Sequence, residues 1–387
     1  MITIEEALEK IHDQQVKTIR TYVSVSEVTG YYLAETIYAP IDLPDFDNSA
    51  MDGYAVCGLH ESYQIVGEIA AGDTANHQLQ DGQAMRIFTG SKVPEKATAV
   101  VMQEKTQVLN SSIVVKDEIK AGQHIRKIGA EIFQGQKVFD IGHFINPAST
   151  GVIASLGIDT IKVYKKPIVN LIITGNELIA PGQTRKPGQV YESNSYSINA
   201  ALQKFGFKRA EIMQISDAYG KTREGIRHFL ELSDLLLISG GISVGDYDYV
   251  ARALLENGVE EVFYRVFQKP GKPLFFGRKE NKFVFALPGN PASSLSCFYI
   301  YVLPLLQKLS GAIDYALPQL KVPISHDYQW KGDRPGFLKA RVENQKVSIL
   351  QGQGSSMIYS MATGNALVLL EPNASLKSGD MVNCILI

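Results

Sequence analysis

The fold is decided by the segment Leu237-Ile238-Ser239-Gly240-Gly241-Ile242-Ser243-Val244-Gly245-Asp246-Tyr247-Asp248, which leads from an apolar run through three glycines to a predicted helix. Residues 234–238 have the length and composition of a buried strand. The same order of strand and helix occurs three more times. The other pairs are strand 168–173 with helix 195–205, strand 209–215 with helix 221–232, and strand 283–287 with helix 293–309. This alternation predicts a doubly wound, mostly parallel α/β sheet that binds ligands past the carboxyl ends of its strands.

Outside this region the sequence pattern is mainly that of β structure. Residues 22–165 contain short β-branched runs separated by turn signals, which predicts one or two small β domains. After Gly311 the predicted helices end, and short strand-like runs predict a small β-barrel at the carboxyl end. The start of the chain differs, because Thr3 and Glu6 form a capping-box pattern and predict an amphipathic helix.

The composition excludes several classes of function. The chain has 387 residues, too many for one hydrophobic core, so several domains are expected. With 38 basic and 40 acidic residues the net charge is -2, which does not favour nucleic acid or a membrane surface as partner. Three widely spaced cysteines form no disulfide framework or zinc motif. There is no signal-peptide pattern and no apolar run of membrane-spanning length, so we expect a cytoplasmic protein.

The glycine-rich segment can bind an anion. Glycines at a strand-to-helix turn let backbone N–H groups approach a phosphate, and the following helix adds a partial positive charge. The segment lacks the ending of a P-loop and the spacing of a dinucleotide motif, so neither an ATPase nor an ordinary dehydrogenase is indicated. Taken alone, such a turn is structural as often as functional.

A second anion-binding element is Lys269-Pro270-Gly271-Lys272-Pro273, here called the lysine turn. Two prolines prevent the turn from continuing as a helix, and two ammonium groups can donate charge-assisted hydrogen bonds to an oxyanion. The alternative is a basic turn exposed to solvent.

Two further strand ends point to the same edge of the predicted sheet. They are Thr174-Gly175-Asn176-Glu177 and Leu287-Pro288-Gly289-Asn290-Pro291-Ala292-Ser293-Ser294. Glu177 and Asp248 can then hold a hard divalent cation such as magnesium while the lysines hold the anion. Each acid can instead cap a neighbouring helix.

A separate polar stretch reads Phe46-Asp47-Asn48-Ser49-Ala50-Met51-Asp52-Gly53-Tyr54-Ala55-Val56. It has little apolar periodicity, so we expect a loop that presents Asp52 to a cleft. The alternative is that Asp47, Asn48 and Ser49 only form turn hydrogen bonds.

The stretch closely resembles the signature of the molybdopterin molybdenumtransferase family, which includes bacterial MoeA and the E domain of gephyrin. Other segments resemble the family in the same order along the chain. They are 86–90 with 93–94, 174–178, 239–249, 269–273 and 288–291.

The resemblance implies four domains and a homodimer whose cleft lies between the α/β domain of one chain and domains of its partner. The domains would be an elongated linking domain at 20–38 and 136–166, an inserted β domain at 39–135, the α/β molybdopterin-binding domain at 1–19 and 167–316, and the β-barrel at 317–387.

The implied activity is that of a transferase in molybdenum cofactor biosynthesis. It would insert molybdate into adenylylated molybdopterin and release AMP, with Mg²⁺ as divalent cation. Molybdopterin adenylyltransferase and acceptor molybdoenzymes would be protein partners, and no nucleic acid or membrane would be bound.

The resemblance also implies roles for individual residues. The catalytic set is Asp52, Thr89, Glu131, Glu177 and Asp248. The set that binds cofactor, phosphate or molybdate is Ser239, Gly240, Gly241, Ser243, Gly245, Lys269, Lys272, Pro288, Asn290, Pro291, Ser293, Arg341 and Ser355. The metal ligands would be Glu177, Asp217 and Asp248.

Several positions depart from the family pattern. An acid that is usual in the family is replaced at Ala130, Asn176 and Ala218. Glu131 keeps the charge but is longer than the usual aspartate by one methylene, and Arg265 stands where lysine is common. Fewer acids weaken or reshape a cation site. Two other functions therefore remain open, a non-catalytic molybdopterin-binding scaffold and a molybdopterin adenylyltransferase, as does a preference for tungstate.

Overall fold

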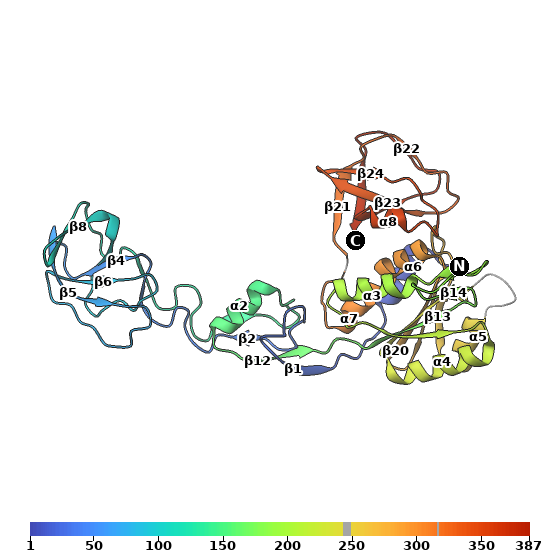
Figure 1. Ribbon diagram of the computed structural model, residues 1–387, viewed down its shortest axis with the longest axis horizontal. Coiled ribbons are helices and arrows are strands. Elements are labelled where there is room, and N and C mark those ends of the chain that lie inside the picture. The colour runs from blue at the N-terminus through green and yellow to red at the C-terminus, as the bar shows by residue number, and fades with distance from the viewer. Residues whose placement is uncertain (243–248, 316) are drawn as a thin grey trace. The chain divides into compact units, whose positions relative to one another are not determined.

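The computed structural model describes residues 1–242, 249–315 and 317–387 (Figure 1). These residues form two compact units, and each is described by itself. One consists of Met1–Thr21, Gly30–Tyr32 and Val163–Ile387, and the other of Tyr22–Thr29 and Leu33–Lys162.

The first unit is built on a six-stranded sheet with the order β16-β13-β17-β20-β19-β18. Its strands are β13 (Val169–Thr174), β16 (Glu211–Ile215), β17 (Leu235–Ser239), β18 (Glu260–Tyr264), β19 (Phe275–Lys279) and β20 (Lys282–Leu287). The four strands predicted from the apolar runs pair in parallel, which confirms the predicted mostly parallel sheet. Every residue of β13 and β17 is buried, as expected for strands covered on both faces.

The strands β19 and β18 extend the sheet in antiparallel pairing and were not predicted. Their sequences are short and mix aromatic with charged residues, so no continuous apolar run marks them. Glu280 has a φ of 55° in the two-residue connection between β19 and β20, which is the conformation that a tight hairpin turn requires.

Helices cover both faces of this sheet (Figure 1). Within the described residues, the α-helices that precede the C-terminal sheet in this unit are α1 (Ile4–His12), α3 (Asn194–Lys204), α4 (Tyr219–Leu232), α5 (Tyr249–Glu256), α6 (Pro291–Cys297) and α7 (Leu303–Leu309). Leu236 and Ile238 of β17 pack with residues of α4 and α5. Leu235 and Leu237 point to the other face and pack with residues of α1, α3 and α7. The alternation of a strand thus divides the core into two layers.

The predicted capping box of α1 is confirmed. The Thr3 hydroxyl accepts a hydrogen bond from the Glu6 N–H at 3.1 Å, and the Glu6 carboxylate accepts one from the Thr3 N–H at 2.8 Å.

The predicted helix 293–309 is interrupted by the π-helical segment η2 (Phe298–Val302) between α6 and α7. Pro304 explains the position of this segment. It has no N–H to donate, and its ring would clash with the carbonyl of Ile300, four residues earlier. The backbone widens in the turn before the proline instead of breaking.

The carboxyl-terminal part of the first unit is a five-stranded antiparallel sheet with the order β21-β27-β25-β23-β24. Its strands are β21 (Gln319–Pro323), β23 (Gly336–Glu343), β24 (Lys346–Ile349), β25 (Ala366–Leu370) and β27 (Met381–Leu386). The sheet curls, since a bridge between Ile324 and Val347 joins the end of β21 to β24. Short β22 (Tyr328–Gln329) and β26 (Ser375–Leu376) pair beside it, and α8 (Tyr359–Ala362) follows a glycine-containing loop.

The second unit contains a six-stranded sheet with the order β7-β4-β6-β5-β9-β8. Its strands are β4 (Gly53–Val56), β5 (Ser62–Ile69), β6 (Gln83–Ile87), β7 (Ala99–Met102), β8 (Thr106–Leu109) and β9 (Ser112–Val115). Tyr54 and Val56 belong to one apolar cluster and Ala55 to another, so the sheet has a core on each face. The β-rich character predicted for this region is confirmed.

One helix of the second unit, α2 (Pro147–Ser155), was not predicted. The signal is present in the sequence: Asn146 is the N-cap, accepting a hydrogen bond from the Ser149 N–H at 2.9 Å, and Pro147 occupies the first turn. The remaining short strands form three two-stranded pairs: β1 (Arg20–Ser24) with β12 (Thr160–Tyr164), β2 (Ile37–Tyr38) with β11 (Lys137–Phe139), and β3 (Asn48–Ser49) with β10 (Ile125–Arg126). Within the described parts of the chain, no helix is long and apolar enough to cross a membrane.

Candidate anion and metal site at the carboxyl edge of the α/β sheet

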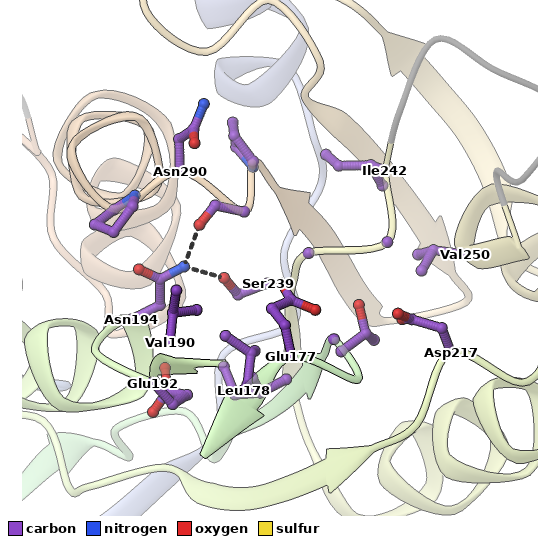
Figure 2. Close-up of a pocket in the computed structure, with 18 of the residues that line it drawn as sticks. Glu177, Leu178, Val190, Glu192, Asn194, Asp217, Ser239, Ile242, Val250 and Asn290 are labelled. Atoms are coloured by element: carbon purple, nitrogen blue, oxygen red, sulfur yellow. Dashed lines mark hydrogen bonds between the residues drawn. The ribbon is translucent and has the colours of Figure 1, made fainter. Parts of the chain in front are cut away.

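A cavity of about 890 Å³ lies at the carboxyl ends of β13, β17 and β20 (Figure 2). This is the edge at which the sequence predicts ligands. Eight of the predicted site residues line it. They are Glu177, Asp217, Ser239, Gly240, Gly241, Pro288, Asn290 and Pro291.

Gly240 and Gly241 form the floor of the cavity next to β13. They have φ values of 91° and 68°, which side chains rarely adopt. A Cβ on Gly240 would lie 2.6 Å from the Thr174 carbonyl oxygen, and one on Gly241 would lie 2.8 Å from the Thr174 hydroxyl. Glycine is therefore required at both positions, and the backbone stays open to a ligand. The predicted residues Ser243, Gly245 and Asp248 lie outside the described residues.

Asn194 joins three elements of the cavity (Figure 2). Its Nδ2 donates to the Ser239 hydroxyl at the end of β17 and to the Gly289 carbonyl after β20, each at 2.8 Å. The Oδ1 of Asn194 and the hydroxyl of Thr174 are buried and have no partner among the described residues. Both residues line the cavity. Unsatisfied buried groups of this kind are costly, so they mark a place where a polar ligand fits.

Two carboxylates, Glu177 and Asp217, line the same cavity (Figure 2). The Asn176 N–H donates to the Asp217 carboxylate at 3.2 Å, and the Asp217 N–H donates to the Asn176 side-chain oxygen at 3.1 Å. Asn176, which departs from the family pattern, thus ties the loop after β13 to the loop after β16.

The donor set fits a magnesium ion shared with a substrate. Magnesium keeps several waters and takes one or two protein carboxylates plus substrate phosphate oxygens. Glu177 and Asp217 supply two carboxylates. Among the described residues, no group of three or more His, Cys, Asp or Glu could hold a metal by itself.

The lysine turn lies beside the cavity, where Pro273 is its lining residue. The Lys269 ammonium sits 5.3 Å from the ring centre of Trp330, a cation–π contact. The backbone of Lys269 pairs with the C-terminal sheet, since its N–H donates to the Pro335 carbonyl at 2.9 Å and its carbonyl accepts from the Phe337 N–H at 2.8 Å. Lys272 is half-buried.

The loop of residues 352–357, here called the 352–357 loop, reaches the site from the C-terminal sheet. Asn290 donates from Nδ2 to the Ser355 hydroxyl at 2.9 Å, and the Ser293 N–H donates to the Ser355 carbonyl at 3.1 Å. Ser356 lines the cavity. The predicted residues Asn290, Ser293 and Ser355 are therefore brought together.

The 352–357 loop is held by Lys339, a buried lysine of β23 that the sequence analysis did not single out. Its side chain is 2% exposed, and its ammonium donates to the carbonyls of Gly352 at 2.7 Å, Gly354 at 3.0 Å and Met357 at 3.0 Å. Burial lowers its pKa to about 8.

Arg341 is not brought to the cavity. It is exposed, its Nε lies 3.2 Å from the Glu343 carboxylate, and it lines a separate hollow of about 310 Å³ with Thr363, Gly364 and Asn365.

Asp52, Thr89 and Glu131 belong to the second unit. The Thr89 N–H and hydroxyl each donate to Asp52 Oδ1 at 2.7 Å. These bonds, from the hydroxyl first and then the N–H, hold the pKa of Asp52 below its ordinary value, so the carboxylate is ionised at neutral pH. Glu131 is exposed, and its N–H donates to the Leu43 carbonyl at 3.0 Å.

Sequence reasoning missed Asn194 and Glu192 as well as Lys339. Glu192 is 6% exposed and accepts hydrogen bonds from the Ser195 N–H at 2.8 Å and the Ser195 hydroxyl at 2.5 Å. The signal was the run of polar residues Glu192-Ser193-Asn194-Ser195 directly before the predicted helix, a pattern typical of a helix start.

Three family descriptions match the chain. Residues 2–157 match the MoeA N-terminal region (domain I and II), residues 170–308 a probable molybdopterin binding domain, and residues 321–387 the MoeA C-terminal region (domain IV).

Whole-length relatives agree with these matches. The chain is 32% identical to a molybdopterin molybdenumtransferase of Haemophilus influenzae, over 99% of this chain and 98% of that protein. It is 30% identical to a molybdopterin molybdenumtransferase of Staphylococcus epidermidis, over 100% and 95%. A crystal structure of the molybdopterin biosynthesis moeA protein from Pyrococcus horikoshii superposes with a TM-score of 0.82, at 27% identity and with both chains covered completely. The chain therefore belongs to the MoeA family of molybdopterin molybdenumtransferases.

Proposed function

We propose that this protein inserts molybdate into adenylylated molybdopterin and releases AMP, with a divalent cation such as Mg²⁺. The observation that carries the proposal is the cavity in which glycine backbone and two carboxylates meet beside the lysine turn. The names of the full-length relatives support the same reaction.

The residues around the cavity suit an adenylylated ligand. Gly240 and Gly241 leave backbone open to phosphate oxygens, and Asn194 and Thr174 offer unpaired polar atoms. Glu177 and Asp217 would hold the cation, which neutralises phosphate charge when it is bound. In this assignment the cavity binds the phosphate-bearing part of the substrate.

The molybdate would bind next to this part. Lys269 and Lys272 supply positive charge, and hydroxyl groups come from Ser293 in α6 and Ser355 in the 352–357 loop. Groups fixed in advance at the place where charge develops are the strongest form of electrostatic catalysis. No covalent protein nucleophile is needed, and the buried Cys297 does not supply one, because burial raises the pKa of its thiol to about 12.

The proposed reaction breaks one phosphoanhydride bond. Water attacks phosphorus, the bond between the two phosphates breaks, and AMP and the molybdopterin phosphate separate. The two dithiolene thiols form bonds to molybdenum and release their protons, and one molybdate oxygen takes up both protons and leaves as water. Asp52, kept ionised by Thr89, would accept the proton of the attacking water.

We propose further that Asp52 and Thr89 act in the site of a second copy of the chain in a homodimer. The four-domain division at the boundaries given above belongs to the same proposal, and the matches to regions described as domains I and II and domain IV support it. A molybdopterin adenylyltransferase would supply the substrate, and apo-molybdoenzymes would accept the product.

The test is release of AMP from adenylylated molybdopterin in the presence of molybdate and Mg²⁺. We expect AMP and pterin-bound molybdenum to form in equal amounts. Glu177→Gln and Asp217→Asn should lower the rate at least about a hundredfold, the scale of losing a charge-stabilising group. Glu260→Gln is the matched control, because Glu260 pairs with Arg278 at the β18 edge.

Other outcomes would decide against the proposal. Tight binding of the pterin without AMP release supports the scaffold, an alternative motivated by the lost acids at Ala130, Asn176 and Ala218. Formation of the adenylylated pterin from ATP and molybdopterin supports an adenylyltransferase.

A further inference from the structure

A buried polar network lies directly behind the lysine turn. Gln268, which is 0% exposed, precedes Lys269 in the chain. Its Nε2 donates to the Gly271 carbonyl in the middle of the turn at 3.1 Å. Its Oε1 accepts a hydrogen bond from the hydroxyl of Tyr301, which is also 0% exposed. A tyrosine and a glutamine are therefore buried to hold one backbone carbonyl.

The turn is packed closely against the helix that carries Tyr301. Gly271 has a φ of 87°, and a Cβ there would lie 2.5 Å from the Cys297 sulfur and 3.0 Å from Gln268 Nε2. The Cys297 sulfur is 3.7 Å from the same nitrogen, within the range of a weak hydrogen bond to sulfur. There is no room for the middle of the turn to move toward the helix.

Tyr301 lies in the π-helical segment η2. Such segments are rare, and they occur frequently at functional sites because the extra residue redirects side chains. Here Pro304 explains why the helix widens, and the buried hydroxyl of Tyr301 reaches Gln268 from the widened turn. The same helical stretch begins with Asn290 and Ser293, which contact Ser355. It therefore contacts both the 352–357 loop and the lysine turn.

The ends of the turn are fixed independently by backbone hydrogen bonds. Lys269 pairs with Pro335 and Phe337, and the Lys272 carbonyl accepts from the Val266 N–H at 3.0 Å. The Gln268 carbonyl accepts from Arg334 Nη1 at 3.3 Å. Arg334 thus holds the chain just before the turn, and within the turn the Gly271 carbonyl is held by the side chain of Gln268.

We propose that Tyr301 and Gln268 are positioning residues that fix the lysine turn so that Lys269 and Lys272 are held ready for an oxyanion. The inference rests on the oxyanion role of the turn in the proposed function. Fixed donors lose little freedom on binding, and a displacement of about 1 Å can cost about a hundredfold in rate. The network would thus set the affinity for molybdate while leaving the neighbouring cavity unchanged.

The test compares Tyr301→Phe with Tyr299→Phe in the full chain. Both tyrosines lie in η2 and in the same apolar cluster, but of the two it is Tyr301 that donates to Gln268. The dissociation constants for molybdate and for AMP are measured separately by calorimetry. We expect Tyr301→Phe to weaken molybdate binding at least about tenfold, with AMP binding unchanged, and Tyr299→Phe to change neither. Gln268→Met, which keeps the side-chain length without polar atoms, should behave as Tyr301→Phe does.

A double-mutant cycle separates positioning from general loosening of the fold. On a Lys269→Met, Lys272→Met background, Tyr301→Phe should cause no further loss of molybdate affinity, because the groups it positions are absent. Wild-type molybdate affinity in a folded Tyr301→Phe protein would overturn the inference, and so would an equal loss on both backgrounds. If the double lysine variant itself binds molybdate as tightly as the wild type does, the oxyanion role that the proposed function gives to the turn is wrong. If both lysines prove necessary and Tyr301 does not, only the inference fails.

Discussion

The Lys339 ammonium lies 2.7 Å from the Gly352 carbonyl oxygen and connects strand β23 to the 352–357 loop. Two more carbonyls of the loop, those of Gly354 and Met357, accept from the same nitrogen. A lysine that is 2% exposed therefore determines where Ser355 meets Asn290 and Ser293.

Lys339→Met should destabilise the protein. The substitution keeps most of the buried volume but removes the charged donor shared by three carbonyls. The donors that remain are neutral: the Ser360 hydroxyl at the Gly352 and Met357 carbonyls, and the Met357 N–H at the Gly354 carbonyl. A hydrogen bond to a charged group contributes about 1.5–3 kcal/mol, so a loss of this size is expected. Urea unfolding monitored by fluorescence of Trp330 measures the change. The control is Lys346→Met in the neighbouring strand β24, where the lysine is exposed and little change is expected. Equal stability of both variants would contradict the structural role of Lys339.

The stability contribution of Lys339 should increase between about pH 8 and the ordinary lysine pKa of 10.5. Burial lowers the folded-state pKa, so in this window the folded protein releases the proton while the unfolded chain keeps it. Because the unfolded state binds more protons, the free energy of unfolding rises with pH there and is independent of this group below about pH 8. Wild-type protein should gain stability relative to Lys339→Met across this window. A difference that shrinks as pH rises would contradict the lowered pKa of Lys339, because it would show that the folded protein holds this proton more tightly than the unfolded chain does.

Gly240→Ala should destabilise the protein, whereas Gly220→Ala should stabilise it. Gly240 has a φ of 91°, and a Cβ there would lie 2.6 Å from the Thr174 carbonyl oxygen, so alanine both strains the backbone and narrows the cavity. Gly220 lies in α4 with open space around its Cβ position, and alanine should stabilise that helix by about 1 kcal/mol. Thermal unfolding and AMP binding measure both. An AMP affinity unchanged in Gly240→Ala would remove this residue from the binding site.

Mixing two inactive variants should restore activity if Asp52 acts in the site of a second copy. Asp52→Asn and Asp217→Asn change different units of the chain. In dimers that contain one copy of each variant, one of the two sites would have both acids. If subunits exchange freely, about half of the dimers in an equal mixture are of this kind, so about a quarter of wild-type AMP release should be recovered. Each variant alone is the control. No recovery after verified subunit exchange would contradict a site shared between chains.

Much of the α/β fold could be predicted because its parallel strands are covered on both faces. A continuous apolar run such as 235–239 then predicts a strand that is buried on both faces. The edge strand β18 and its neighbour β19 carry charged residues and gave no such run. The π-helical segment arises from a conflict between Pro304 and the preceding carbonyls, which periodicity does not detect.

The site could be predicted only in part, for a similar reason. Glycine, proline and acidic residues at strand ends mark the cavity, and Gly240, Asn290 and Asp217 line it as expected. Lys339 and Arg341 occupy the same face of one strand by sequence, and nothing in the sequence shows that Lys339 is buried while Arg341 is exposed. Their difference depends on the 352–357 loop, which covers only Lys339.

A crystal structure of the full chain with AMP, magnesium and molybdate bound would show whether the cavity and the lysine turn form one active site. We expect the AMP phosphate at Gly240 and Gly241, the cation at Glu177 and Asp217, and molybdate between the lysine turn and Ser355. Molybdate or AMP bound elsewhere, with this cavity filled only by water, would contradict it.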